Sequence, residues 1–177
     1  EIAGFAQAMR DKMTKIESVD DAIDMCGTGG DASGTFNIST AASFVVAGAG
    51  VPVAKHGNRS MTSKSGSADV LTALGIDITL PPEKVSECIR TIGIGFMFAP
   101  SLHPAMKYAM SARKALGTRT VFNILGPLCN PAGVDRQLMG IFEGSLTDKV
   151  AKVLQKLGSK HAMVVHGYEG LDEVSTT

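Results

Sequence analysis

The chain has 177 residues, of which 44% are hydrophobic and 19% are charged. This length and composition are typical of a globular domain with a substantial core and exclude an extensively disordered chain. The 17 Lys and Arg residues balance the 17 Asp and Glu residues, so the chain lacks the basic footprint of a nucleic-acid-binding protein. No apolar run approaches the roughly 20 residues that span a bilayer, and we expect no membrane partner.

Helices and strands alternate in the hydrophobic pattern. Apolar residues at helical spacing predict a helix over residues 2–16, and a short strand over 23–26 runs into a glycine-rich loop. Polar side chains at 37–40 cap a second helix, whose body over 41–47 is apolar on nearly every face and predicts a buried helix. The remaining pattern predicts strands over 51–54, 94–99 and 162–165, a strand ending at 140–142, and helices over 68–74, 81–92, 104–116 and 146–157.

Several of these strands are continuous apolar runs, which is typical of strands buried on both faces. The sequence therefore predicts an α/β fold with a mainly parallel central sheet and helices on both faces. In such sheets ligands bind beyond the carboxyl ends of the strands. The polar motifs follow Cys26, Ala54, Ala99 and Val165, so we expect them at that edge of the sheet.

The three cysteines, Cys26, Cys88 and Cys129, form no C-x-x-C pair, and an odd number cannot pair completely within one chain. We expect buried free thiols in a reducing cytosol, and therefore a cytoplasmic protein. The chain begins with Glu1 instead of methionine and stops shortly after a motif, which predicts a fragment trimmed at both ends.

Residues 27–31, with the sequence GTGGD, are the first candidate binding element. Three glycines let backbone N–H groups approach phosphate oxygens, and the helix opening near Asn37 adds free N–H groups and a positive dipole end. Asp31 repels phosphate, so we expect it to hold a ribose hydroxyl or a metal-bound water. The alternatives are a plain turn and the dinucleotide fingerprint G-x-G-x-x-A, although the next strand ends in Lys55 and His56 instead of an acidic residue.

Residues 55–63, with the sequence KHGNRSMTS, form a second candidate anion-binding element after the next strand. Lys55 offers a point charge and Arg59 a planar fork of donors. The segment continues to Ser67, which stands at a predicted helix start. A solvated surface loop is the alternative interpretation.

Two further patterns carry charged side chains. The adjacent carboxylates Asp172 and Glu173 supply the hard oxygen ligands that suit Mg²⁺ shared with substrate phosphates, although adjacent acids are also common on surfaces. Arg113 can clamp a carboxylate through two hydrogen bonds, unless it is simply solvated. His103 alone would be a structural histidine or a helix cap, and His161 is expected to be structural.

Together these motifs resemble the anthranilate phosphoribosyltransferases, enzymes of tryptophan biosynthesis. The matching segments occur in that family's order across essentially the whole chain: GTGGD at 27–31, FNIST at 36–40, KHGNRS at 55–60, SGSADVL at 65–71, FAP at 98–100, HPAMK at 103–107, RTVFNILGPL at 119–128, HG at 166–167 and GLDE at 170–173. Two positions depart from the family pattern, because Thr72 replaces an acidic residue and Thr62 replaces a serine.

The resemblance implies a reaction in which the amine of anthranilate attacks C1 of 5-phosphoribosyl-1-pyrophosphate (PRPP) and releases pyrophosphate. Carried over by motif, the residues that would bind PRPP are Gly27, Gly30, Asp31, Thr35, Asn37, Ile38, Ser39, Thr40, Lys55, His56, Gly57, Asn58, Arg59, Ser60, Met61, Thr62, Ser63 and Ser67. Those that would hold anthranilate or line its route are Gly27, His56, Asn58, His103, Arg113, Gly126 and Pro127. Ser39, Asp172 and Glu173 would bind two Mg²⁺ ions.

No catalytic acid or base is assigned, because an aromatic amine is already a free base at neutral pH. Positioning and stabilisation of the leaving pyrophosphate are expected to supply most of the rate. The resemblance also implies that residues 1–16 are the last part of a helical N-terminal domain used for dimerisation. Residues 17–177 would be the catalytic domain, truncated at its C-terminus, in a parent protein that is a homodimer.

Two other functions remain as alternatives. The fold resembles that of pyrimidine nucleoside phosphorylases, from which residues 55–60 and the helix of Arg113 distinguish this chain. A non-catalytic paralogue that binds nucleic acid would be expected to lose the acidic pair or the glycine loop and to gain a basic groove, and this neutral chain keeps both motifs.

Overall fold

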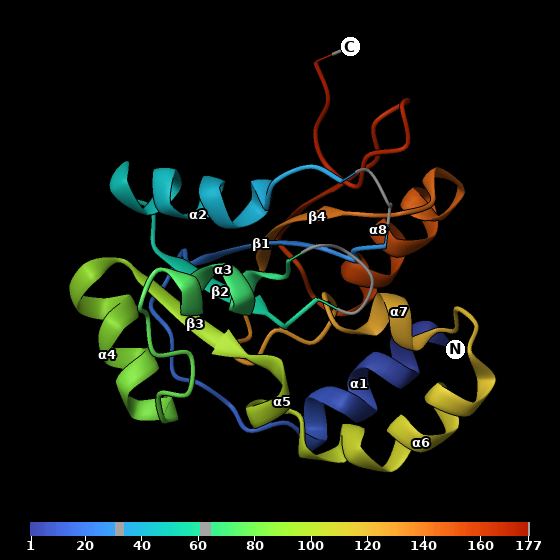
Figure 1. Cartoon of the computed structure of the whole chain (residues 1–177), viewed down its shortest axis with the longest axis horizontal. Helices are drawn as coiled ribbons and strands as arrows, with labels where there is room; N and C mark the ends of the chain where they lie inside the picture. The colour runs from blue at the N-terminus through green and yellow to red at the C-terminus, as the bar shows by residue number, and fades with distance from the viewer. Residues whose placement is uncertain (31–33, 61–64, 177) are drawn as a thin grey trace.

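The protein is built around one parallel β-sheet (Figure 1). The computed structural model describes residues 1–30, 34–60 and 65–176. Its five strands lie in the order β3-β2-β1-β4-β5, and every neighbouring pair is parallel. The strands are β1 (Ile23–Gly27), β2 (Val53–Gly57), β3 (Ile94–Phe98), β4 (Arg136–Gly140) and β5 (His161–Val165). The predicted α/β fold with a parallel central sheet is confirmed.

Helices cover both faces of the sheet, as predicted. They are α1 (Ile2–Lys12), α2 (Ile38–Gly48), α3 (Ser67–Ala73), α4 (Pro82–Ile92), α5 (Ala99–Leu102), α6 (Lys107–Leu116), α7 (Phe122–Leu125) and α8 (Thr147–Lys156), with short 3₁₀ turns η1 (Pro104–Met106) and η2 (Gly144–Leu146). Lys55 of β2 reaches Ser39 on α2, on one face. On the other face, Met139 of β4 packs with residues of α1, α7 and α8. Figure 1 shows the same separation of α2 from α1 and α7.

The strand order reverses at β1, since β2 and β3 follow on one side and β4 and β5 on the other. In open parallel sheets this reversal creates a crevice beyond the carboxyl ends of the central strands, where ligands bind. The loop that follows Gly27 of β1 begins at that crevice. Topology therefore places the glycine loop at the centre of the carboxyl edge.

The pairing between β1 and β2 relies on side chains. Their ladder contains one partner pair, Ile23 with Val53, whereas β1 pairs with β4 along all of its length, from Ile23–Arg136 to Gly27–Gly140. Beyond that pair, the carboxylate of Asp24 accepts a hydrogen bond from the backbone N–H of His56. The ammonium of Lys55 donates to the backbone oxygen of Met25. Side chains thus form hydrogen bonds with the N–H of His56 and the carbonyl of Met25, which would pair with backbone groups in a regular parallel ladder.

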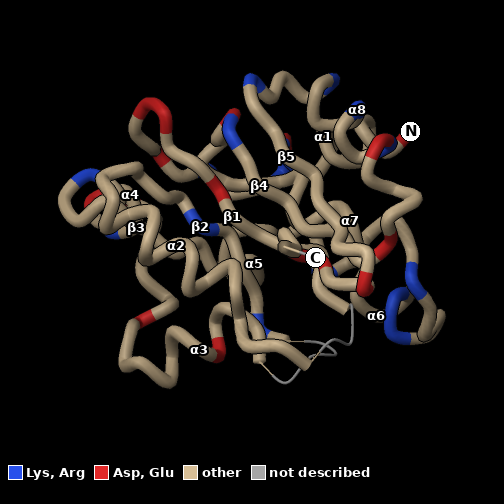
Figure 2. Tube along the Cα trace, turned by 90° about the horizontal axis from the view of Figure 1, so that it is seen from above, with Lys and Arg blue, Asp and Glu red and all other residues tan. Residues whose placement is uncertain are grey.

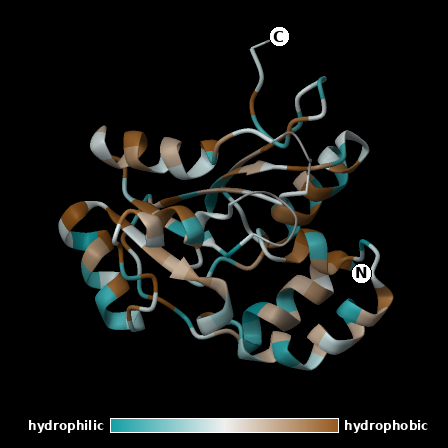
Figure 3. Ribbon diagram, in the orientation of Figure 1, coloured by the Kyte–Doolittle hydropathy of each residue, from teal (hydrophilic) through white to brown (hydrophobic). Residues whose placement is uncertain are grey.

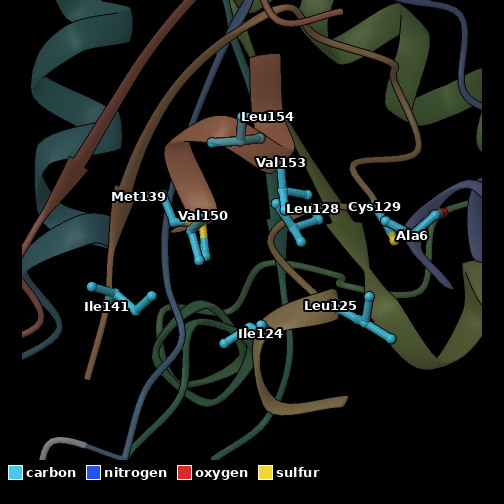
Figure 4. Close-up of a cluster of buried hydrophobic side chains, with 10 residues drawn as sticks. All are labelled: Ala6, Ile124, Leu125, Leu128, Cys129, Met139, Ile141, Val150, Val153 and Leu154. Atoms are coloured by element: carbon cyan, nitrogen blue, oxygen red, sulfur yellow. Dashed lines mark hydrogen bonds between the residues drawn. The ribbon is translucent and has the colours of Figure 1, made fainter. Parts of the chain in front are cut away.

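The largest hydrophobic cluster lies between the sheet and α1, α7 and α8 (Figure 4). It consists of Ala6, Ile124, Leu125, Leu128, Cys129, Met139, Ile141, Val150, Val153 and Leu154. A second cluster joins α4 to β2 and β3 and includes Ile16, Val85, Ile89 and Met97. Helix α1 therefore packs into the same core as the sheet, while the proposed domain boundary after residue 16 stays a prediction.

The first helix is shorter than predicted. We expected a helix over residues 2–16, but α1 ends at Lys12 and Met13 is extended. The backbone N–H groups of Thr14 and Ile16 bond instead to the carbonyls of Leu102 and Pro131. The apolar spacing continued past Lys12 because Ile16 is buried against α4, not because the helix continues.

The expectation of a buried second helix is wrong. On α2, Phe44 is 40% exposed and Val45 is 72% exposed, whereas the buried residues are Thr40 and Ser43. The Ser43 hydroxyl donates to the carbonyl of Ser39, so this small polar side chain is satisfied within the helix and packs close to the sheet. Phe44 and Val45 therefore lie on the outer surface of a helix that Figure 3 shows to be rich in hydrophobic residues.

Other boundaries differ by a few residues. The strand predicted over 51–54 is β2, which begins at Val53 and extends to Gly57, and β3 ends at Phe98 because Ala99 starts α5. The helix predicted from Pro104 begins as the 3₁₀ turn η1 before α6. The cysteines are free, as expected, but only Cys129 is fully buried.

Charged residues are spread over the fold. Figure 2 shows Lys and Arg on several elements, interspersed with Asp and Glu. Among the described residues, no helix is long and apolar enough to cross a membrane.

A substitution at Gly95 of β3 tests how closely α4 packs against the sheet. A Cβ there would lie 2.6 Å from Cγ1 of Ile89 and 2.9 Å from the carbonyl oxygen of Val85, so Gly95→Ala must push α4 away from the sheet. We expect the free energy of unfolding in urea to fall by about 1–3 kcal/mol. Gly4→Ala on α1, where nothing lies within 4 Å, is the control and should raise that free energy by about 0.5–1 kcal/mol. Equal effects of both changes would contradict the packing of α4 against β3.

Candidate active site

The end of β1 is shaped by glycines that make room for Asp172. A Cβ on Gly27 would lie 2.8 Å from the Asp172 carboxylate, and one on Gly140 would overlap the Asp172 backbone oxygen. The Asp172 carboxylate accepts a hydrogen bond of 2.8 Å from the backbone N–H of Gly29. Gly29 and Gly30 have φ angles of 65° and 81°, which glycine adopts without strain. The last segment of the chain is thereby attached to the glycine loop.

Ser39 and Glu173 lie around one cavity of about 160 Å³. Its lining comprises Met25, Cys26, Ile38, Ser39, Ala42, Leu138, Glu173 and Val174. In the described part of the chain, no group of three or more His, Cys, Asp or Glu side chains is placed to hold a metal ion by itself. One hydroxyl and two carboxylates are nevertheless the hard oxygen donors that Mg²⁺ takes when substrate phosphates complete its shell. Ser39 and Glu173 therefore supply hard oxygen donors at the cavity itself, and Asp172, one residue before Glu173 and held by the N–H of Gly29, would complete a donor set for Mg²⁺ shared with a phosphate.

Asn37 caps helix α2 at the edge of this cavity. Its side-chain oxygen accepts from the backbone N–H of Thr40 at 3.1 Å and from the Ser39 hydroxyl at 3.4 Å. Thr40 itself is buried, and its hydroxyl has no hydrogen-bond partner among the described residues. Thr35 is exposed before the helix begins. Asn37 thus fixes the helix N-terminus, and Ser39 is the hydroxyl placed at the cavity.

Lys55 is buried instead of lying in a solvated loop. Its ammonium donates to the carbonyl of Met25 at 2.6 Å and to the Ser39 hydroxyl at 3.3 Å. Burial lowers the pKa of Lys55, and the neighbouring charges of Asp24 and Glu173 oppose that shift. Its cation therefore lies beside Ser39, one of the candidate metal donors.

The segment after β2 is organised by Asp69, a residue to which the sequence analysis gave no role. Its carboxylate accepts from the backbone N–H groups of Ser60 and Gly66, each at 2.9 Å, and from the Arg59 guanidinium at 2.9 Å. These backbone donors, above all that of Ser60, lower the pKa of Asp69. The sequence does contain a signal for this role. Asp69 lies three residues after Gly66, the position at which an acidic residue caps the start of a helix.

Close packing also confines the neighbours of Asp69. A Cβ on Gly57 would lie 2.8 Å from the Phe96 ring and 3.0 Å from Cβ of Ser67, which holds the start of α3 against β3. Asn58 uses its side-chain oxygen to accept from the backbone N–H of Arg59 at 2.7 Å. Asp31, Met61, Thr62 and Ser63, which were also predicted to bind PRPP, lie outside the described residues.

Two buried histidines meet on the other face of the sheet. Nε2 of His56 and Nε2 of His103 are 3.1 Å apart, so one ring donates to the other. Burial, with a further contribution from His103, lowers the pKa of His56 to about 3, although a hydrogen bond with the Gly126 backbone opposes this shift. The backbone oxygen of Pro127 accepts from the side chain of Gln137 at 2.7 Å. The structure thus joins His56, His103 and Gly126, three of the residues predicted on the anthranilate route, into one uncharged wall.

Arg113 and Arg119 flank the loop that leads to α7. The half-exposed guanidinium of Arg113 lies 5.4 Å from the centre of the Phe122 ring. Arg119, which the sequence analysis included in a motif without a role, lies 4.1 Å from the centre of the Phe142 ring and donates to the carbonyl of Gly30. Arg119 therefore attaches this loop to the glycine loop, a contact between residues far apart in sequence that no spacing rule could indicate.

The comparisons with known proteins agree with this geometry. The family model described as "Glycosyl transferase family, a/b domain" matches residues 19–177. Anthranilate phosphoribosyltransferases of Xanthobacter autotrophicus and Afipia carboxidovorans are 61% and 59% identical to it over 99% and 100% of this chain. The chain spans about half the length of these relatives, 51% and 52%.

Solved structures of similar proteins lead to the same family. The anthranilate phosphoribosyltransferase of Thermus thermophilus matches with a TM-score of 0.90 and 46% identity, over 98% of this chain and 52% of that one. The Saccharomyces cerevisiae enzyme, in complex with PRPP and Mg, matches with a TM-score of 0.89 and 35% identity, over 98% and 49% of the two chains. Sequence, fold and site geometry together place this chain in the glycosyl transferase family whose α/β domain it contains.

Proposed function

We propose that this chain carries the active site of a Mg²⁺-dependent anthranilate phosphoribosyltransferase. In the reaction, the anthranilate nitrogen forms a bond to C1 of the PRPP ribose, the bond from C1 to pyrophosphate breaks, and the nitrogen loses one proton to solvent. The supporting observation is the meeting of the glycine loop, the Ser39 and Glu173 cavity and Asp172 at one sheet edge. Support also comes from relatives of that name, which match 99% or more of this chain.

The pyrophosphate side of PRPP is assigned to the glycine loop, the start of α2 and the segment after β2. Free N–H groups and the dipole at the N-terminus of α2 favour an anion there. Lys55 supplies a cation beneath Ser39. Ser39, Asp172 and Glu173 would hold Mg²⁺, which would supply positive charge for the leaving pyrophosphate.

The anthranilate side is assigned to the opposite wall. His56 and His103 are uncharged, which leaves the guanidinium of Arg113 to attract the substrate carboxylate. Asn58, Gly27, Gly126 and Pro127 are proposed to complete this side. Since His56 has a pKa of about 3, it is too weak a base to remove the amine proton. This agrees with a mechanism in which positioning, not base catalysis, supplies the rate.

Other parts of the proposal concern the whole protein. We infer two Mg²⁺ ions per site, a cytoplasmic location and a homodimer. Residues 1–16 are proposed to be the end of a dimerising helical domain, in agreement with the exposed side chain of Phe5 on α1. The direct test of the activity is the loss of anthranilate fluorescence on addition of PRPP and Mg²⁺. Consumption of pyrimidine nucleosides and phosphate, without PRPP turnover, would contradict the proposal.

The acidic pair is tested by Asp172→Asn combined with Glu173→Gln. We expect turnover to fall by about 100-fold or more, because the charge that holds Mg²⁺ is lost, while the melting temperature changes little. Calorimetric titration with Mg²⁺ in the presence of PRPP should show weaker binding. Asp20→Asn with Glu17→Gln makes the same charge change in the exposed segment before β1 and should leave both measurements unchanged. Unchanged turnover in the first variant would remove the acidic pair from the metal role.

The carboxylate clamp is tested by Arg113→Ala. We expect the KM for anthranilate to rise by about 10-fold and the KM for PRPP by less than about 2-fold, because a bidentate charged contact to one substrate is lost. Lys114→Ala, at the neighbouring exposed position of α6, is the control and should change neither value. Equal increases in both KM values for Arg113→Ala would contradict the assignment.

The neutral His56 gives the folded protein a pH dependence. The folded-state pKa of about 3 lies below the ordinary value of 6.5, so between these values the unfolded chain binds a proton that the folded chain does not. The resulting stability is complete above pH 6.5 and is lost as pH falls toward 3. Urea unfolding on both sides of pH 6.5 should show a smaller loss on acidification in His56→Gln than in the parent. His161→Gln, at an exposed position, should behave as the parent does.

A further inference from the structure

Asp24 is a fully buried carboxylate at the centre of the sheet, behind the candidate active site. One of its oxygens accepts from the backbone N–H of His56 at 3.2 Å. The other accepts from the side-chain amides of Asn130 at 2.8 Å and Gln137 at 3.5 Å. A buried carboxylate is costly unless donors surround it. The donors here come from β2, from β4, from the loop before β4 and from the Cys26 thiol of β1.

Both side-chain donors also bond to a second group. The Asn130 amide also donates to the carbonyl of Ala54 at 2.9 Å, so it ties its loop to β2. The Gln137 amide lies closer to two other acceptors, the carbonyl of Pro127 at 2.7 Å and the sulfur of Cys26 at 3.2 Å. Asp24 is therefore linked to His56 directly and to Pro127 through one side chain.

These contacts replace regular strand pairing at the site. The β1–β2 ladder has one partner pair, Ile23 with Val53, and beyond it the N–H of His56 bonds to Asp24. The direction of the His56 backbone, and hence of its imidazole toward His103, depends on this carboxylate. Asparagine has a similar shape, but its NH₂ group would face the NH₂ group of Asn130 and leave one donor unsatisfied.

We propose that Asp24 is a positioning residue for the acceptor substrate, which acts through the backbone of His56 and, by way of Gln137, through the carbonyl of Pro127. It touches no reacting atom. It holds the uncharged wall against which the ring of the aromatic amine would lie, while the pyrophosphate side is held by α2 and the glycine loop. This inference rests on the proposed function, because the acceptor side is defined by it.

The Asp24→Asn substitution tests this proposal, because it should affect the KM for anthranilate more than the KM for PRPP. We expect the KM for anthranilate to rise by about 10-fold and the KM for PRPP by less than about 2-fold, because the loss of a buried hydrogen bond distorts one wall only. Asp135→Asn is the control: it makes the same substitution at a surface ion pair with Lys160, just before β4, and should leave both KM values unchanged. Equal increases in both KM values of Asp24→Asn, with a lower melting temperature, would mean that Asp24 supports the fold alone and would overturn the proposal.

A second readout does not depend on turnover. Hydrogen exchange of the His56 backbone amide should be faster by about 10-fold in Asp24→Asn than in Asp135→Asn, because the acceptor of that N–H is weakened. Unchanged exchange would overturn the proposal even if activity fell. If the parent protein does not consume anthranilate, the proposed function fails, and the exchange measurement still decides whether Asp24 holds His56.

Gln137→Met is a second variant that tests the proposal if the Asp24→Asn protein does not fold. It removes the donor to Pro127 without introducing a charge and leaves the bond between Asp24 and His56 in place. We expect a smaller rise in the KM for anthranilate, about 3-fold, with normal exchange of the His56 amide. An unchanged KM for anthranilate would overturn the part of the proposal that acts through Pro127.

Discussion

The structure depends on two buried charges that join β1 to β2, Lys55 and Asp24. Each bonds to the backbone of the other strand, since Lys55 donates to Met25 and Asp24 accepts from His56, and the side chain of Asn130 is a further donor to Asp24. Removing either Lys55 or Asp24 would leave the other as an uncompensated buried charge. The stability lost in this way exceeds the stability that the two charges together contribute. This constraint orients the end of β2 and with it the two residues, Lys55 and His56, that face opposite sides of the sheet.

The two sides differ in charge. On the α2 face, Lys55, Ser39, Glu173 and the start of α2 make an electrostatic environment suited to a phosphate and a divalent cation. On the other face, the two uncharged histidines add no cation to the site. A substrate with a highly charged end and a second, aromatic substrate would each meet the side that matches it.

Close approach of backbone segments gives the site its final form. Gly27 and Gly140 allow Asp172 to reach the N–H of Gly29, so the last segment of the chain becomes part of the glycine loop. Arg119 attaches the loop before α7 to the same element from the other side. The glycine loop is thus supported by two segments, each about 90 residues or more away in sequence.

The sequence by itself determined the alternation of strands and helices, the parallel sheet and the placement of the motifs at its carboxyl edge, because apolar runs and glycine turns are local signals. It misjudged α2 because composition counts apolar side chains without telling which face they occupy, and Phe44 and Val45 lie outward. Only the tertiary structure decided the burial of Lys55, the contact between His56 and His103, and the hydrogen bonds of Asp24, Asp69 and Arg119. These properties arise from desolvation and from contacts between distant segments, and neither is encoded in the spacing of residues along one strand or helix.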